Sequence, residues 1–466
     1  MNKKILMWGT GKIAEKYEKI ILLSHIDIIA YVDSKSEKWG RMRNGIVIIR
    51  PEEIRNFANF PILIACADID DVKNQIKLIN REQAIISYQC LLQEVFGLNN
   101  IRPIENQISL PKSYAVLIDN LNGRWGGAED WCHKVGYELY KTKRTVRIYE
   151  GKNGIEYEQP LRDIICKEEI PDDIILRHEF LINNLEKIRP FVLINVWYSD
   201  LLWAAIAIKR KYPNDVKIIS SILNDVESMY ENSHIWKKDI DKYICISKKI
   251  AYKLINKYDI PLQKVFYKEP FIEKRRIMDR TYSLNPDIPI KICFPCRLVR
   301  IQKRAHLVPQ IISKLNSTIA NKFVFNIVGD GECETLIREF VKQNKLEKYV
   351  NFYGKIGKSE LITMLYTQDI YLNISEFEGT SLTMLEALAS GCVPVVTNVS
   401  GVEEYIQNGK NGFISEVDNL DEIINNIIFL EKNRNVLLEY GSICKTQILN
   451  RCQLDKYIDF IEDVIW

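Results

Sequence analysis

The stretch that decides the fold of this chain is residues 378–386, which read Glu-Gly-Thr-Ser-Leu-Thr-Met-Leu-Glu. The apolar run Ile-Tyr-Leu-Asn-Ile-Ser at 370–375 precedes it and predicts a strand. Gly391 and Pro394 end the helix that follows and release a second strand over 393–399. The region therefore predicts strand, tight glycine turn, helix and strand, as in an open parallel α/β sheet.

The start of the predicted helix can bind an anion. The first four N–H groups of a helix lack an internal partner, so we expect the amides of Thr380, Ser381 and Leu382 to be free for a phosphate. Glu386 lies one turn deeper on the same side, where its carboxylate can accept hydrogen bonds from hydroxyls. This combination indicates a ligand with both phosphate and sugar.

The two glutamates of this stretch do not have the spacing of a glycosidase pair. Retaining glycosidases hold their carboxyls about 5 Å apart and inverting ones up to about 9.5 Å, whereas eight helical residues span about 12 Å. One glycosidic bond cannot be flanked by both. On spacing alone, an amphipathic helix with an exposed acid at each end stays open as the alternative.

The surroundings resemble the donor-binding signature of glycosyltransferase family 4, the group 1 glycosyltransferases of the two-domain GT-B fold. In that family a Glu, seven residues and a second Glu are followed by Ala and a small-Gly-x-Pro-Val-Val strand. The matching residues here are Glu378, Gly379, Glu386, Ala387, Gly391, Pro394, Val395 and Val396. Other pieces follow the family's order, and the resemblance covers roughly residues 112–450: Arg297 and Lys303 after the strand 290–295, Gly329-Asp330-Gly331-Glu332, Asn351-Phe352-Tyr353-Gly354 and Asn408-Gly409-Lys410-Asn411-Gly412.

The resemblance implies roles for these residues. Arg297, Lys303 and the helix-start amides are expected to hold the donor diphosphate as negative charge builds on it, without a metal ion. Glu386 is expected to hold the ribose and Glu378 the donor sugar, while the leaving phosphate takes the acceptor proton. The expected catalytic residues are Arg297, Lys303 and Glu378, and the expected donor-binding residues are Gly126, Gly127, Asn224, Gly329, Gly331, Tyr353, Gly379, Thr380, Ser381, Leu382 and Glu386.

Two features depart from the family's pattern. The six positions from Arg297 to Lys303 are a long spacing, so Arg300, Lys303 and Arg304 all stay open as the phosphate ligand. The family often has a His at the end of an acceptor-lobe strand, where this chain has Asn224. An Asn can form hydrogen bonds but cannot titrate, so it cannot relay a proton.

The loop before the first helix of the acceptor lobe carries further candidates. Gly126-Gly127-Ala128-Glu129 resembles the family's loop whose glycine amides approach the donor phosphate. Arg124, Trp125 and Trp131 are candidate acceptor contacts because aromatic faces stack on sugars. Packing in the core is the alternative for the tryptophans.

The composition excludes several classes of function. Lys plus Arg number 64 and Asp plus Glu 61, so the net charge of +3 offers no basic field for nucleic acid. The eleven cysteines lack a repeated spacing, and Cys293-x-x-Cys296 has no second pair, so a zinc site is not expected. We expect cytosolic thiols, no signal peptide, no metal and no required cofactor.

Residues 190–208 contain one charge in nineteen residues and therefore raise the alternative of a membrane span. Asp200 near the centre opposes that interpretation, because a charge there costs about 2.5–3.5 kcal/mol on insertion scales. A strand over 191–197 and a helix over 201–211 explain the segment without a membrane.

Residues 1–93 predict a small Rossmann-like domain. The strand 4–7 enters Gly9-Thr10-Gly11-Lys12-Ile13-Ala14, and Asp33 closes a second strand 22 residues after Gly11. This resembles a dinucleotide-binding fingerprint with its ribose-binding acid, so Gly9, Gly11 and Asp33 form a candidate second nucleotide site. Only one such unit is seen, so NAD(P) binding and a structural or assembly role both stay open.

The sequence thus predicts a three-part α/β chain. The resemblance implies a retaining transfer of a sugar from a nucleoside diphosphate sugar to a glycan or lipid-linked glycan in bacterial surface polysaccharide assembly. A cytoplasmic protein with peripheral membrane association and oligomerisation through the N-terminal domain is expected. The alternatives are a GT-B nucleotide-sugar epimerase, a non-catalytic sugar-nucleotide-binding subunit and an oxidoreductase carried by residues 1–93. The predicted parts are a Rossmann-like domain (1–93), a linker (94–111), an acceptor lobe (112–272), a donor lobe (285–450) and a helix (451–466) returning to the acceptor lobe.

Overall fold

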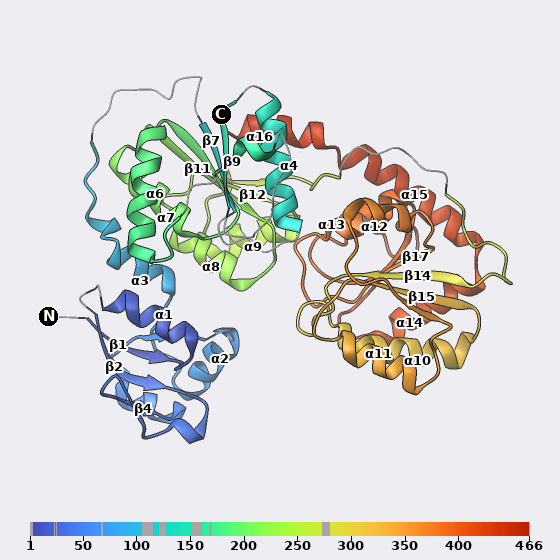
Figure 1. Cartoon of the computed structure of the whole chain (residues 1–466), viewed down its shortest axis with the longest axis horizontal. Coiled ribbons are helices and arrows are strands. Elements are labelled where there is room, and N and C mark those ends of the chain that lie inside the picture. The colour runs from blue at the N-terminus through green and yellow to red at the C-terminus, as the bar shows by residue number, and fades with distance from the viewer. Residues whose placement is uncertain are drawn as a thin grey trace. The chain divides into compact units, whose positions relative to one another are not determined.

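The computed structural model describes residues 3–465 apart from 23, 25, 67–68, 105–114, 121–126, 143, 151–160, 167–169 and 273–279. Three successive sheets, almost wholly parallel, run through these residues with helices between their strands (Figure 1). This confirms the predicted α/β class with three Rossmann-like parts. The chain divides into two compact units, one of Met1–Lys112, Glu168–Pro190 and Asp200–Val216, the other of Ser113–Lys167, Phe191–Ser199 and Lys217–Trp466.

The first unit is built on a six-stranded sheet with the order β3-β4-β2-β1-β5-β6, in which only β3 pairs antiparallel. Alternate residues of the central strands, such as Leu6, Trp8 and Val32, meet in its core. The elements are β1 (Lys3–Trp8), α1 (Lys12–Ile21), β2 (Ile26–Val32), β3 (Met42–Arg43), β4 (Ile46–Ile49), η2 (Pro51–Phe57), β5 (Ile62–Ile64), α2 (Ile69–Ile79), β6 (Ile85–Ile86), α3 (Tyr88–Val95) and η3 (Leu98–Asn100), joined by α6 (Ile174–Ile188) and α7 (Asp200–Lys211).

Helix α3 packs against the two later helices of the same unit through aromatic side chains. Trp203 of α7 donates its indole N–H to Gln89 Oε1 at 2.7 Å. Phe96 stacks on His178 of α6 with 3.8 Å between ring centroids, and burial lowers the pKa of His178 to about 4. The predicted strand and helix of the apolar segment are confirmed as β10 (Phe191–Asn195) and α7. Across the described residues, no helix is both long and apolar enough to span a bilayer.

The second unit contains a seven-stranded sheet with the order β13-β12-β11-β10-β7-β8-β9. The C-terminal helix packs into the core of this sheet, because Tyr457, Ile461 and Val464 are buried there with Trp131. The elements are β7 (Ala115–Asn120), α4 (Gly127–Lys141), β8 (Val146–Glu150), α5 (Leu161–Ile164), β9 (Ile165–Cys166), β10, β11 (Val216–Ile222), α8 (Glu227–Ile235), β12 (Lys242–Cys245), α9 (Lys248–Tyr258), β13 (Val265–Tyr267) and α16 (Leu454–Ile465).

The other sheet of this unit has six strands in the order β16-β15-β14-β17-β18-β19. Helices cover both of its faces (Figure 1): α10, α11 and α14 bury one apolar cluster, and α13 and α15 bury another. The elements are β14 (Ile290–Pro295), α10 (Val308–Ile319), β15 (Phe323–Val328), α11 (Glu334–Gln343), β16 (Val350–Phe352), α12 (Lys358–Leu365), β17 (Ile370–Asn373), α13 (Leu382–Ala389), β18 (Val393–Thr397), β19 (Phe413–Ser415), α14 (Leu420–Lys432) and α15 (Asn435–Arg451).

Candidate functional site

The strand order of the last sheet sets the place of the site. The chain runs outward from β14 through β15 to β16, then returns to β17 on the other side of β14 and continues to β19. Ligands of such sheets bind at the carboxyl ends of the strands where the order reverses. The loop that carries Arg297 and Lys303 follows β14, and the loop that carries Glu378 follows β17.

A pocket of about 490 Å³ lies at this point and is lined from both sheets of the second unit. It contains eight of the residues predicted for the donor site: Gly127, Asn224, Arg297, Lys303, Glu378, Thr380, Ser381 and Leu382. Five other predicted residues are not part of its lining, namely Gly329, Gly331, Tyr353, Gly379 and Glu386. Gly126, Arg124 and Trp125 lie outside the described residues.

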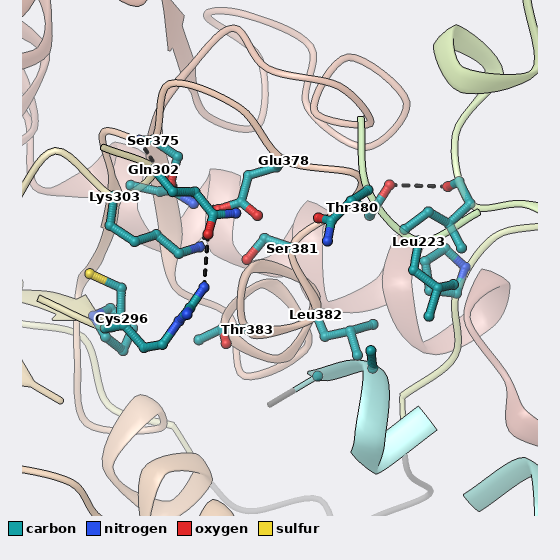
Figure 2. A pocket seen from close by; sticks show the side chains of 18 of the residues that line it. Leu223, Cys296, Gln302, Lys303, Ser375, Glu378, Thr380, Ser381, Leu382 and Thr383 are labelled. Carbon is teal, nitrogen blue, oxygen red and sulfur yellow. Dashed lines mark hydrogen bonds and ion pairs between the residues drawn. The ribbon is translucent and has the colours of Figure 1, made fainter. Parts of the chain in front are cut away.

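An ion pair between Lys303 and Glu378 forms part of the pocket lining. Lys303 Nζ contacts Glu378 Oε1, and the two side chains are 15% and 8% exposed. Ser375 Oγ donates to the same carboxylate oxygen at 2.8 Å, and Figure 2 shows these three side chains converging. The cation predicted for the diphosphate and the acid predicted for the sugar therefore neutralise each other before any ligand binds.

The neighbouring cations are arranged differently. Arg297 lines the pocket and donates to Gln302 Oε1 at 2.8 Å. Arg304 bonds the carbonyl of Val417 and Asp418 Oδ1, and neither it nor Arg300 lines the pocket. Of the three cations that the sequence left open, Lys303 is the one that reaches the pocket.

The helix after Glu378 starts two residues later than predicted. Ser381 is the N-cap of α13, and its hydroxyl accepts from the Met384 amide at 3.2 Å. A serine with extended backbone is a preferred N-cap, so Thr380 stays outside the helix and donates through Oγ1 to the Ile246 carbonyl at 3.0 Å. The first helical amides are thus those of Leu382–Met384, not Thr380–Leu382, and Leu382 and Thr383 line the pocket.

The predicted glycines act through close backbone packing. A Cβ at Gly379 would lie 2.2 Å from the Leu223 carbonyl oxygen, just before Asn224. Gly329 and Gly331 have φ of +126° and +148°, and side chains there would meet the carbonyls of Cys296 and Leu298. They allow the loop after β15 to pack on the segment that carries Arg297.

Glu386 is buried outside the pocket wall and is paired. It is 5% exposed, and its Oε1 lies 3.1 Å from Lys358 Nζ at the start of α12. Sequence reasoning missed Lys358, because a lysine that follows Gly357 at a helix start carries no local signal of its own. It also missed Gln302 and Trp197, which line the pocket together with Glu129, the last residue of the predicted 126–129 loop.

Trp131 is primarily a packing residue. Its indole N–H donates to Tyr457 Oη at 3.2 Å, and its side chain is 2% exposed. Trp131 nevertheless also lines the pocket. Cys296 also lines it, and burial raises the pKa of its thiol to about 12, so this cysteine is a protonated thiol at neutral pH.

At the candidate second nucleotide site, the Asp33 carboxylate already accepts hydrogen bonds from groups of the same domain. Asp33 accepts from Lys38 Nζ at 2.8 Å, from the Lys35 amide at 3.0 Å and from the Thr10 hydroxyl. A Cβ at Gly9, which has φ +116°, would lie 2.5 Å from the Ala65 carbonyl oxygen, so this glycine serves the turn itself. A ribose would have to displace Lys38 and Thr10 to reach the carboxylate.

Replacing Lys38 by methionine is expected to lower the free energy of unfolding by about 1 kcal/mol at pH 7, the worth of one hydrogen bond. Although burial acts to raise it, the pKa of Asp33 is lowered by the bonds from Lys38 and Thr10. A carboxyl group whose pKa is lowered in the folded state stabilises the fold at pH values above the pKa that it has in the unfolded chain. The difference in unfolding free energy between Lys38→Met and the wild type should therefore shrink below about pH 4. Urea unfolding measures it, with the exposed Lys35→Met as control; equal stability of the two variants would contradict the expectation.

Comparisons with known proteins found similar sequences for two parts of the chain. Residues 279–445 match the family model of glycosyl transferases group 1, and residues 1–86 match the model C2185-like, N-terminal. An uncharacterized glycosyltransferase of Methanocaldococcus jannaschii is 25% identical over 63% of this chain and 79% of its own length. The N-acetyl-alpha-D-glucosaminyl L-malate synthase of Bacillus anthracis is 28% identical. The match covers 45% of this chain and 52% of that enzyme.

A solved structure extends the likeness to the fold. The Anabaena protein HepE, in complex with UDP and glucose, superimposes with a TM-score of 0.59 at 14% identity. The match covers 76% of this chain and 99% of that chain. At this identity the likeness concerns the fold alone.

Proposed function

Since this chain belongs to the group 1 glycosyl transferases, we propose that it transfers a sugar from a nucleoside diphosphate sugar to a hydroxyl acceptor with retention at the anomeric carbon. The observation that carries the proposal is the Lys303–Glu378 pair in the pocket at the end of β14 and β17. A cation and an acid side by side provide one group for the diphosphate and one for the sugar. Arg297 and the first amides of α13 lie along the same wall.

The proposed reaction breaks the bond between the anomeric carbon and the diphosphate. Negative charge then grows on the leaving phosphate, where Lys303, Arg297 and the positive end of the α13 dipole stabilise it. Lys303 has to exchange Glu378 for the phosphate when the donor enters, which frees the Glu378 carboxylate for hydroxyls of the sugar. The leaving phosphate takes the acceptor proton, so neither a metal ion nor another cofactor is required.

The proposed acceptor is a glycan or lipid-linked glycan in bacterial surface polysaccharide assembly, met at the cytoplasmic face of the membrane. Trp197, which follows β10, and Glu129 of α4 are proposed to contact it, since they line the pocket from the elements of the seven-stranded sheet and not from those that carry Lys303 and Glu378. Aromatic faces stack on sugars, and a carboxylate accepts from hydroxyls.

Nucleotide binding tests the proposal first. UDP is bound in the Anabaena structure, so thermal unfolding should be followed with UDP and with the diphosphates of guanosine, adenosine, cytidine and thymidine. A ligand at 100 times its dissociation constant stabilises the fold by about 2.7 kcal/mol, and we expect one of the five to do so. A protein whose melting temperature none of the five moves would contradict the proposal.

Release of nucleoside diphosphate from the sugar donor then separates the enzyme from its alternatives. We expect release in the presence of EDTA that accelerates when acceptor glycans are added. Conversion of the donor to an epimeric sugar nucleotide without net release of nucleoside diphosphate would favour an epimerase, and binding with neither release nor conversion would favour a non-catalytic subunit. Activity that EDTA abolishes and manganese restores would overturn the metal-free mechanism.

A further inference from the structure

We propose that Lys358 is a positioning residue that holds the buried carboxylate of Glu386 in its nucleotide-binding orientation and ties it to Asp130 of α4. The inference rests on the proposed function, in which Glu386 receives the ribose of the donor. It adds a residue that the sequence pattern did not single out, and it links the two pocket-lining sheets through one side chain.

The contacts that carry the proposal start at the first residue of α12. Lys358 Nζ lies 3.1 Å from Glu386 Oε1 on α13 and also contacts Asp130 Oδ2 in the first turn of α4. Lys134, one turn further along α4, lies 2.6 Å from the same Asp130 oxygen. Two cations and two carboxylates thus form a neutral cluster.

The members of this cluster differ in burial, and Glu386 is the most buried of them. The Glu386 side chain is 6% exposed, whereas those of Lys358 and Asp130 are 34% and 32% exposed. A carboxylate removed from water is charged only if a cation or hydrogen-bond donors compensate it. Lys358 supplies such a cation at 3.1 Å from the carboxylate.

The protonation states agree with this role. Burial acts to lower the pKa of Lys358, but Glu386 and Asp130 raise it, so its ammonium group stays charged. Burial likewise acts to raise the pKa of Asp130, and the two lysines lower it. Asp130 therefore keeps Lys358 directed toward α13, and Lys358 fixes the Glu386 carboxylate in one orientation, as ribose recognition requires.

A double-mutant cycle tests the proposal. The titrant is UDP, replaced by the best binder of the other four nucleoside diphosphates if UDP does not bind, and calorimetry gives the dissociation constant. We expect Lys358→Met to weaken binding about 5- to 20-fold, at or below the cost of losing one charge-assisted hydrogen bond, because Lys358 acts on the nucleotide only through Glu386. Lys358→Arg, which keeps the charge, should stay within about 3-fold of the wild type.

The decisive measurement is Lys358→Met in a Glu386→Gln background. If Lys358 acts through the Glu386 charge, its loss should cost less than about 2-fold there. A cation that attracts the anionic nucleotide directly would cost as much in both backgrounds, and that result would overturn the proposal. So would a Lys358→Met protein that binds as tightly as the wild type or more tightly, since Lys358 would then only compete with the ribose.

Two controls separate this proposal from others. Lys342→Met removes an exposed lysine from α11 and should leave the dissociation constant unchanged. Melting temperatures must show that each variant is folded; if Lys358→Met is not, Lys358→Gln enters the same cycle. A wild-type protein that binds none of the five nucleotides defeats the proposed function and this inference together, whereas a wild type that binds, with additive losses in the cycle, defeats this inference alone.

Discussion

Replacing Lys303 by alanine is expected to lower turnover about 100- to 1,000-fold, the usual cost of removing one group that stabilises charge in a transition state. The ammonium group meets the donor diphosphate in the ground state as well, but the charge on the leaving phosphate grows as the sugar departs. The loss should therefore be greater in kcat than in the affinity for nucleoside diphosphate. Steady-state kinetics and calorimetry on one protein preparation measure the two effects.

The structure supplies a matched control for this variant. Arg304 is the next residue, but it bonds the Val417 carbonyl and Asp418 away from the pocket, so Arg304→Ala should retain turnover within about 3-fold. Arg297→Ala should reduce kcat in the same sense as Lys303→Ala. Lys303→Ala leaves the buried Glu378 without its cation. The double variant Lys303→Ala, Glu378→Gln therefore shows whether a loss of stability contributes to the fall in turnover. A loss confined to KM would remove Lys303 from the proposed role.

Replacing Glu386 by alanine is expected to weaken nucleoside diphosphate binding about 10- to 150-fold, because the loss of a charge-assisted hydrogen bond costs about 1.5–3 kcal/mol. The variant should fold, since Lys358 keeps its contact with Asp130 when the glutamate is gone. Calorimetric titration measures the change. Glu360→Ala, at an exposed acid of α12, is the control and should bind like the wild type. Unchanged affinity in folded Glu386→Ala protein would exclude this residue from the ribose site.

Local sequence patterns were sufficient to predict the strand–turn–helix–strand unit around Glu378. Apolar runs and the Gly391 and Pro394 signals gave β17, α13 and β18, because these signals act within a few residues. The start of α13 was predicted two residues early, since the Ser381 hydroxyl caps the helix itself. The candidate loops could also be predicted, because carboxyl ends of adjacent parallel strands meet at one sheet edge.

Pairings between distant residues could not be predicted in this way. Lys303 and Glu378 are 75 positions apart, and Lys358 and Asp130 are 228 apart. Nothing in either local pattern indicates that an anion-binding lysine is already neutralised or that a helix-start lysine reaches α4. At Asp33 the local pattern was misleading in the opposite way. The fingerprint predicts a ribose ligand, but the carboxylate accepts hydrogen bonds from Thr10 and Lys38 of the same segment.

The return of α16 to the seven-stranded sheet has a consequence for how the polypeptide can be divided. The two stretches of chain that join the pocket-lining sheets are tied together where the Ile272 amide donates to the Cys452 carbonyl at 2.9 Å. Beyond that point, Tyr457, Ile461 and Val464 bury their side chains, each gaining about 1.5–3 kcal/mol. A polypeptide divided between the two pocket-lining sheets would thus keep its two parts associated through α16, because this helix belongs to the second part of the chain and packs into the core of the first.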